Sequence, residues 1–178
     1  VSLNYDNGPI LLLANFSRLS DSDNSFIWSL GGQYRFGPFK TSLGYEQTRD
    51  NGWKPHATGS SYANKYEGVR SRQDNYILSG EYATGPHKVA AAFNYMKIRD
   101  IRRESGSSDD SLFLGNYDSG DARKYSIGYF YSLSKRTTLY GQLAYTDFED
   151  KTLARFFRGE TFSGDSVTGI SLGINHLF

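Results

Sequence analysis

The sequence predicts an all-β protein: an antiparallel up-and-down barrel that crosses a membrane, with eight or nine strands in this chain. Three observations lead to this prediction. Apolar and polar residues alternate with a period of two over segments of about ten residues, the length that a tilted strand needs to cross a bilayer. The connections between these segments alternate between tight turns and longer polar stretches. Aromatic residues gather near the ends of the segments, as they do at membrane interfaces.

The composition excludes several other classes. The 178 residues carry a net charge of +1 without a basic arm, so no nucleic-acid partner is expected. There is no cysteine, which excludes a disulfide framework and a thiolate metal site. No apolar run approaches the roughly 18 residues of a transmembrane helix. The mean hydropathy of −0.57 still fits a membrane barrel, because only alternate residues of its strands face lipid.

Four strands are predicted in the first part of the chain. Each begins or ends where the alternation stops. Gly8-Pro9 and Gly37-Pro38 are predicted as tight turns, since glycine tolerates positive φ and proline ends the hydrogen-bond ladder. A short polar loop at 20–25 separates the second strand from the third. The strands are Val1–Asp6, Ile10–Arg18, Phe26–Phe36 and Phe39–Thr48.

Five more strands are predicted after a long polar stretch at about 49–74. A Gly85-Pro86 turn joins the first two of them, and the short segment Ser134–Thr137 joins the next two. Further long polar stretches lie at about 98–120 and 147–165. The strands are Asn75–Ala83, Lys88–Lys97, Arg123–Leu133, Thr138–Thr146 and Ser166–Phe178.

The apolar rows predict which side chains face lipid, and their aromatic residues form two belts. The belt near the short turns contains Tyr34, Phe36, Phe39, Tyr82, Tyr131 and Phe178. The belt near the long stretches contains Phe16, Phe26, Tyr45, Tyr76, Tyr95 and Tyr145. In transmembrane barrels the short turns face the periplasm and the long loops face outward, so Phe178 is expected at the periplasmic side.

The closing strand carries the most specific pattern in the chain. Its ending Gly173-Ile-Asn-His-Leu-Phe178 has the form G-x-x-H-x-F, and it resembles the terminal strand of Gram-negative outer-membrane porins, in particular the trimeric general porins of beta-proteobacteria. The segments Leu3–Pro9 and Gly80–Tyr82 are similar to strand ends and turns of the same family. The resemblance implies an outer-membrane, trimeric, 16-stranded barrel for passive diffusion of small hydrophilic solutes and ions. It also implies that the barrel-assembly machinery reads the terminal strand, at Ile170, Leu172, Ile174, His176 and Phe178.

The chain is about half as long as members of that family, and nine strands are an odd number. Two alternatives follow: residues 1–178 form one domain that is the C-terminal part of a larger barrel, or eight strands close alone into a small barrel with a structural or adhesive role. An eight-stranded lumen is filled by side chains, whereas the inward positions here are mostly small, which favours the larger, water-filled barrel. These small inward residues are Ser29, Gly31, Ser42, Gly44, Ser79, Ala90, Ala92, Ser126, Gly128, Ala144, Gly169, Ser171 and Gly173.

A diffusion channel needs a wet lumen, a size limit and an electric field rather than a catalytic residue. Six charged residues are predicted to line the pore: Arg35, Lys40, Lys88 and Lys124 against Glu46 and Glu81. Their sum is about plus two, which predicts a mild preference for anions. The alternative for Lys40 and Lys88, and to a lesser degree for Arg35, is that they extend from the turns into periplasmic water.

The remaining polar groups do not form a catalytic site. Lys97, Arg99, Arg102 and Arg103 are expected just outside a strand end, where they either pair with lipopolysaccharide phosphates or belong to a solvated loop. Ser171 and His176 are five residues apart on one strand and therefore point to opposite faces, so they form no nucleophile–base pair. We expect no enzyme activity and no cofactor.

No metal site is expected either. His56, His87 and His176 are scattered through the chain, and their spacing does not match a ligand cluster. The acidic residues Asp109, Asp110 and Asp118 lack the frame of a calcium-binding loop and fit a solvated loop better.

Overall fold

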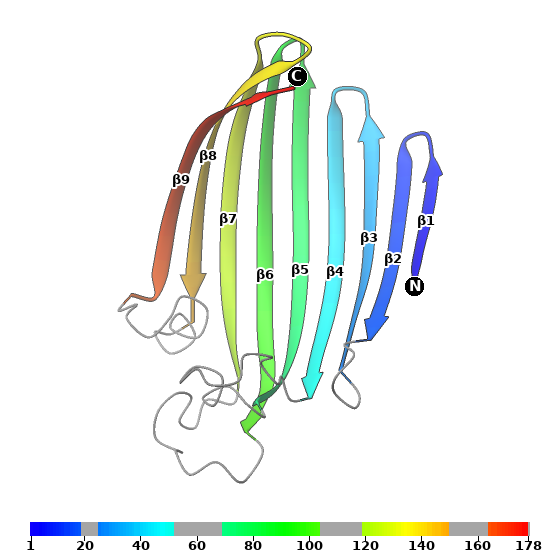
Figure 1. Cartoon of the computed structure of the whole chain (residues 1–178), viewed down its shortest axis with the longest axis vertical. Helices are drawn as coiled ribbons and strands as arrows, with labels where there is room; N and C mark the ends of the chain where they lie inside the picture. Colours follow the sequence, from blue (N-terminus) through cyan, green and yellow to red (C-terminus); the bar gives the residue numbers. More distant parts are fainter. Residues whose placement is uncertain (19–24, 52–68, 104–118, 150–163, 178) are drawn as a thin grey trace.

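The chain forms one curved antiparallel sheet of nine strands that follow each other in sequence order (Figure 1). The computed structural model describes residues 1–18, 25–51, 69–103, 119–149 and 164–177. The strands are β1 (Ser2–Asn7), β2 (Ile10–Arg18), β3 (Phe26–Phe36), β4 (Phe39–Asn51), β5 (Val69–Thr84), β6 (His87–Arg103), β7 (Ser119–Ser132), β8 (Thr137–Phe148) and β9 (Ser166–His176). Among the described residues, no helix has the length and apolar character needed to cross a membrane.

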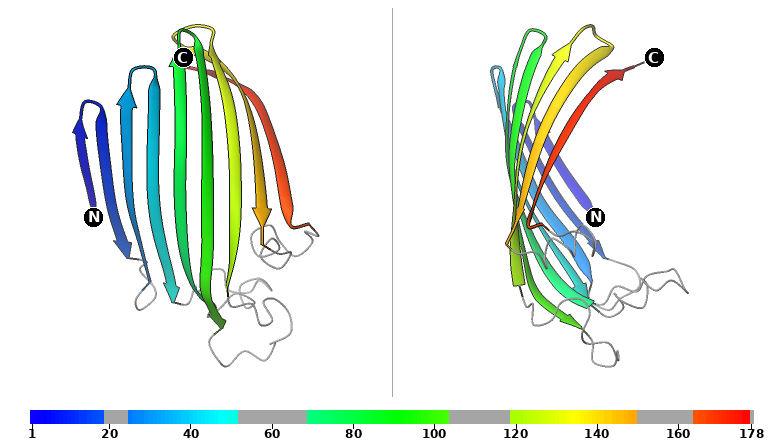
Figure 2. Two further views of the ribbon diagram at one scale, coloured as in Figure 1. Left: turned by 180° about the vertical axis from the view of Figure 1, so that it is seen from behind. Right: turned by 90° about the vertical axis from the view of Figure 1, so that its left-hand side faces the viewer.

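The sheet curves into an open trough, with β1 and β9 at its two edges (Figure 2). Each inner strand pairs with both of its neighbours in the sequence, whereas β1 pairs with β2 and β9 pairs with β8. Within the described strands, β1 and β9 do not pair with each other. The structure therefore does not show the small closed barrel that the sequence left open as an alternative.

The tight turns repeat one geometry. Gly8, Gly37 and Gly85 have φ values of 59°, 58° and 53°, and each is followed by a proline. Glycine with positive φ at the first central position suits the two-residue turns whose twist matches that of the strands. Each proline carbonyl then accepts a hydrogen bond from the strand beyond the hairpin, for example Arg35 N–H to Pro9 O at 2.8 Å.

The strand register joins the predicted lipid-facing rows into one continuous apolar face. Leu12 pairs with Gly32, Gly32 with Leu43 and Leu43 with Leu78. The same line of pairs continues through Phe93, Tyr125 and Tyr145 to Thr168 of β9. These side chains are largely exposed: Leu43 by 63% and Leu172 by 81%. The prediction of which residues share a face is therefore confirmed for the described residues.

The strands next to the long connections extend further than predicted. β4 continues to Asn51, β5 begins at Val69 and β6 continues to Arg103, although these positions were assigned to polar loops. Lys97 and Arg99 thus lie within β6 rather than outside a strand end. Apolar alternation marks a strand only where one face meets lipid, so sequence patterning does not detect the part of a strand that passes beyond the aromatic belt.

Candidate functional site

The candidate site is the face of the sheet opposite the apolar rows, which we call the polar face. The register brings all six predicted pore-lining charges to this face. Arg35 pairs with Lys40 and Lys40 with Glu81, while Lys124 pairs with Asn94 nearer the long connections. A hollow of about 410 Å³ lies between them, lined by polar groups such as Lys40, Glu81 and Lys124 together with small residues.

The charges near the short turns are gathered around one carboxylate. Glu81 Oε2 lies 3.0 Å from Lys40 Nζ and 3.7 Å from Lys88 Nζ. The three side chains come from β4, β5 and β6 and are between 23% and 41% exposed. Both lysines thus turn toward Glu81 along the wall rather than extending from the turns into water. Two cations sharing one anion leave this cluster of three side chains with a net charge of about plus one.

Two aromatic residues on the polar face were not predicted as part of the site. Lys88 Nζ lies 4.6 Å from the centre of the Phe130 ring, a cation–π distance. The Phe130 and Tyr140 rings are 6.3 Å apart on β7 and β8. Both residues occupy inward positions of the alternation, which is the signal that identifies them.

The small residues of the wall do not all leave open space. A Cβ atom built at Gly173 would lie 2.5 Å from Tyr140 Oη, and one at Gly128 would lie 3.0 Å from the Phe130 ring. At Gly169, by contrast, nothing lies within 4 Å. Aromatic rings therefore lie over some of the glycines of the polar face near β7–β9. Only some of the small residues have free space next to them.

One inward charge was missed by the sequence analysis. Asp6 pairs with Leu11 of β2, while its neighbour Tyr5 pairs with Leu12 on the apolar face. The alternation of Leu3 and Tyr5 already implied this position for Asp6. Counting Asp6 lowers the net charge of the inward side chains that the structure describes from about plus two to about plus one.

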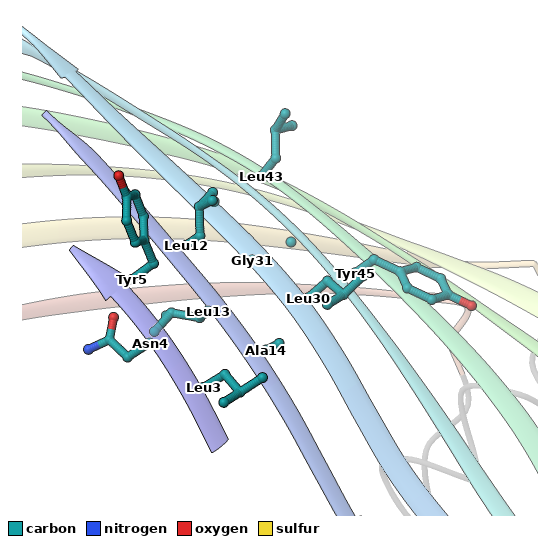
Figure 3. A pocket seen from close by; sticks show the side chains of 12 residues that line it. Leu3, Asn4, Tyr5, Leu12, Leu13, Ala14, Leu30, Gly31, Leu43 and Tyr45 are labelled. Atoms are coloured by element: carbon teal, nitrogen blue, oxygen red, sulfur yellow. The ribbon is translucent and has the colours of Figure 1, made fainter. Parts of the chain in front are cut away.

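The opposite face is apolar and shallowly indented. Figure 3 shows one depression, lined by Leu3, Leu12, Leu30 and Leu43 from four successive strands. Aromatic rings lie at both ends of this apolar face. The ring centres of Tyr45 and Tyr76 are 5.0 Å apart near the long connections, and those of Phe36 and Phe39 are 5.4 Å apart near a short turn. The two belts predicted from the sequence thus lie on one face and at opposite ends of the strands.

The residues predicted as an assembly signal lie on the edge strand β9. Ile170, Leu172 and Ile174 project from the apolar face and are 62–81% exposed. His176 Nδ1 lies 2.9 Å from Thr137 Oγ1, and Phe178 lies outside the described residues. Ser171 pairs with Gln142 on the polar face while His176 pairs with Thr137 on the apolar face, so the two face opposite ways as predicted.

The predicted polar clusters of the long connections are only partly described. His56, Asp109, Asp110 and Asp118 lie outside the described residues, and β6 reaches Arg103 without a description of the side chains at its end. In the described ranges, no group of three or more histidine or acidic side chains is placed to hold a metal ion.

Comparisons with known proteins agree with this geometry. The profile of a family described as Gram-negative porin matches residues 1–151. Outer membrane porin protein 32 of Delftia acidovorans is 27% identical over 169 residues, which cover 82% of this chain and 44% of that protein. An outer membrane porin protein of Bordetella pertussis is 26% identical over 196 residues, covering 99% of this chain and 45% of that protein.

Two solved structures share the fold. An anion-selective porin from Comamonas acidovorans matches with a TM-score of 0.68 and 22% identity, over 99% of this chain and 48% of that one. A loop L8 deletion mutant of OmpT, an outer membrane protein of Vibrio cholerae, matches with a TM-score of 0.71 and 18% identity, over 99% of this chain and 51% of that one. The chain spans about half the length of the proteins it matches.

Proposed function

Because the chain belongs to the Gram-negative porin family, whose members are outer-membrane channels and not enzymes, we propose that its nine strands form about half of the wall of a water-filled channel. Small hydrophilic solutes and ions diffuse through this channel along the polar face. The observation that carries the proposal is the separation of the two faces. Apolar side chains dominate one side of the described strands between the aromatic belts, and small or polar side chains are most frequent on the other, with exceptions such as Leu13 and Ile77.

The rest of the wall comes from strands beyond these nine. Both edges of the sheet lack a partner among the described strands, and an unpaired strand edge is not tolerated in the hydrocarbon of a bilayer. The similarity covers about half of each matching porin. We therefore propose a barrel of about 16 strands in which residues 1–178 form the C-terminal portion, assembled as a homotrimer. Recognition by the barrel-assembly machinery falls to β9, which presents an apolar row at the sheet edge, together with Phe178.

The proposed selectivity is a mild preference for anions. Among the inward side chains that the structure describes, four cations stand against Glu46, Glu81 and Asp6, which is an excess of one positive charge. Arg35 and Lys124 form no ion pair with another described side chain. A charged wall in a confined lumen attracts counter-ions. The anion-selective porin named above has a related fold at low identity, so it supports the fold and leaves the selectivity of this chain to experiment.

The test is a reversal-potential measurement on the full-length protein in a planar bilayer with a salt gradient. We expect stepwise channel conductance and a reversal potential of the sign that indicates anion preference. Absence of conductance in the folded protein would contradict the channel itself. A clear cation preference would contradict only the selectivity.

A further inference from the structure

Three arginines lie side by side on the apolar side of the sheet, just beyond the aromatic belt of the long connections. Arg49 of β4 pairs in register with Arg72 of β5, and Arg72 pairs with Arg99 of β6. We call these residues the arginine row. Like charges on directly opposite positions of neighbouring strands repel each other, so their alignment calls for a compensating anion.

The protein itself compensates only part of this charge. Asp74 Oδ2 lies 3.2 Å from Arg99 Nη2 and 3.6 Å from Arg72 Nε, while Arg49 forms no ion pair with another described residue. The side chains of Arg72 and Arg99 remain 44% and 43% exposed. One carboxylate against three guanidinium groups leaves an excess of two positive charges in the arginine row.

The carboxylate that anchors the row is rigidly held. Asp74 is 1% exposed, and its Oδ1 accepts hydrogen bonds from Tyr45 Oη at 2.6 Å and Gln47 Nε2 at 2.8 Å. Trp28 Nε1 in turn donates to Gln47 Oε1 at 3.3 Å. The aromatic belt is thus hydrogen-bonded to the anchor of the arginine row, which fixes the height of the row relative to the membrane interface.

We propose that the arginine row binds the phosphate group of a glycolipid of the outer leaflet. The inference rests on the outer-membrane placement proposed above. The row lies four residues beyond Tyr45 along β4, about 13 Å at roughly 3.3 Å per residue, which carries it from the interfacial belt through the headgroup level of the bilayer. Planar guanidinium groups bind phosphate oxygens through paired hydrogen bonds, so two or three in a row form a suitable phosphate site.

Neighbouring charges on the same side leave the site positive. Lys97 pairs in register with both Asp74 and Asp121. Asp121 is already engaged, because Tyr95 Oη lies 2.9 Å from its Oδ2 and Arg123 Nη2 lies 3.2 Å from it. Asp147 pairs in register with Arg123, and Glu149 Oε2 accepts a hydrogen bond from Asp121 N–H at 2.9 Å. These further carboxylates lie beside Arg123 of β7, whereas Asp74 is the described carboxylate in contact with the arginine row.

The experiment measures binding of lipid A that carries its phosphates to the full-length protein in detergent. The test variant is R72Q/R99Q. The control is K135Q/R136Q, which removes the same charge from the exposed turn between β7 and β8 at the other end of the strands. We expect the affinity of the test variant to fall by roughly fivefold for each guanidinium removed, in line with the contribution of a cation at an anionic membrane surface. The control should keep the affinity of the unmodified protein.

Two further probes identify the ligand. Dephosphorylated lipid A should bind the unmodified protein no better than it binds R72Q/R99Q, and inorganic phosphate should not displace the lipid at equal concentration. Equal binding of both forms of lipid A, or displacement by phosphate alone, would overturn a lipid-phosphate site. So would dissociation of the oligomer in R72Q/R99Q with unchanged lipid affinity, because the row would then contact another protein chain.

Folding and channel function are followed on the same preparations. If R72Q/R99Q does not fold, R72Q/D74N/R99Q removes the buried carboxylate together with its cations and is expected to show the same loss of lipid affinity. Unchanged affinity in that folded triple variant would also overturn the proposal. Conductance reports on the channel independently: a protein that binds lipid A but does not conduct would contradict the proposed function and not the arginine row.

Discussion

The two faces of the sheet reverse the usual relation between polarity and exposure. On the apolar face, Leu43 is 63% and Ile170 74% exposed, whereas on the polar face the Glu81 side chain is only 23% exposed. Among the described hydrophobic residues, only Ile98, Ala122 and Phe148 are buried. The apolar face therefore depends on the surrounding lipid for its burial, while the polar face packs its side chains against each other. Substitutions on the two faces should accordingly destabilise the protein for different physical reasons.

The largest expected effect is a charge placed in the middle of the apolar face. Leu43→Arg puts a guanidinium into the lipid between the two aromatic belts and should destabilise the folded protein by about 2–4 kcal/mol. The matched control is Ser42→Arg on the adjacent residue, which faces the hollow of the polar face. Urea unfolding in lipid vesicles measures both. Similar losses for the two variants would mean that the faces do not differ in their surroundings.

A smaller effect is expected where aromatic rings cover the polar face. Gly173→Ala places a Cβ against the Tyr140 ring and should cost about 1–3 kcal/mol, since an overpacked position forces its neighbours to move. Gly169→Ala on the same strand meets nothing within 4 Å and should stabilise by about 0.5 kcal/mol through reduced backbone entropy.

The pair Gly173–Tyr140 is tested by the double variant Gly173→Ala/Tyr140→Ala. If the ring is the obstacle, this variant should be less destabilised than the sum of the two single ones, as a double-mutant cycle in the same vesicles will show. Strict additivity of the changes in unfolding free energy would show that this contact is not the cause of the destabilisation.

The smallest effect on stability, but a clear one on conduction, is expected at Glu81. Glu81→Gln leaves Lys40 and Lys88 without their carboxylate, and a partly exposed ion pair of this kind contributes only about 0–1 kcal/mol to stability. The anion preference should rise, measured as a shift of the reversal potential in a salt gradient. Asp74→Asn, on the apolar face, should leave the reversal potential unchanged, and an equal shift there would argue against the polar face as the conducting wall.

The sequence predicted the arrangement of the strands well because lipid imposes a simple rule on them. Where one face meets hydrocarbon, every second residue must be apolar, so the rows from Leu12 to Leu172 could be assigned from the alternation alone. The short turns followed in the same way from glycine and proline. Strand ends at Phe36 and Phe39 were therefore predicted to the residue.

The contacts of the site could not be predicted to the same extent. Beyond the belt, both faces of a strand meet a polar environment and the alternation disappears, so the extended ends of β5 and β6 and the alignment of their arginines could not be predicted. The alternation also assigns each residue to one face of the sheet but does not identify the residues that its side chain contacts. It placed Lys40, Glu81 and Lys88 inward without showing that the three side chains converge. The ring of Tyr140 over Gly173 likewise depends on a side-chain rotamer that no pattern records.

The glycine–proline turns also bear on the order in which the sheet forms. Each joins its two strands through two residues, so the entropy lost on closing the hairpin is small, whereas the connections 52–68 and 104–118 must close much longer loops. Hairpins β1–β2, β3–β4 and β5–β6 should consequently form as separate units before they join. The proline carbonyls then provide the first rung between one hairpin and the next, as Pro38 O does for Ala83 N–H at 2.9 Å. The hydrogen bonds between hairpins would thus form first at the turn end of the strands and then toward the opposite side of the membrane.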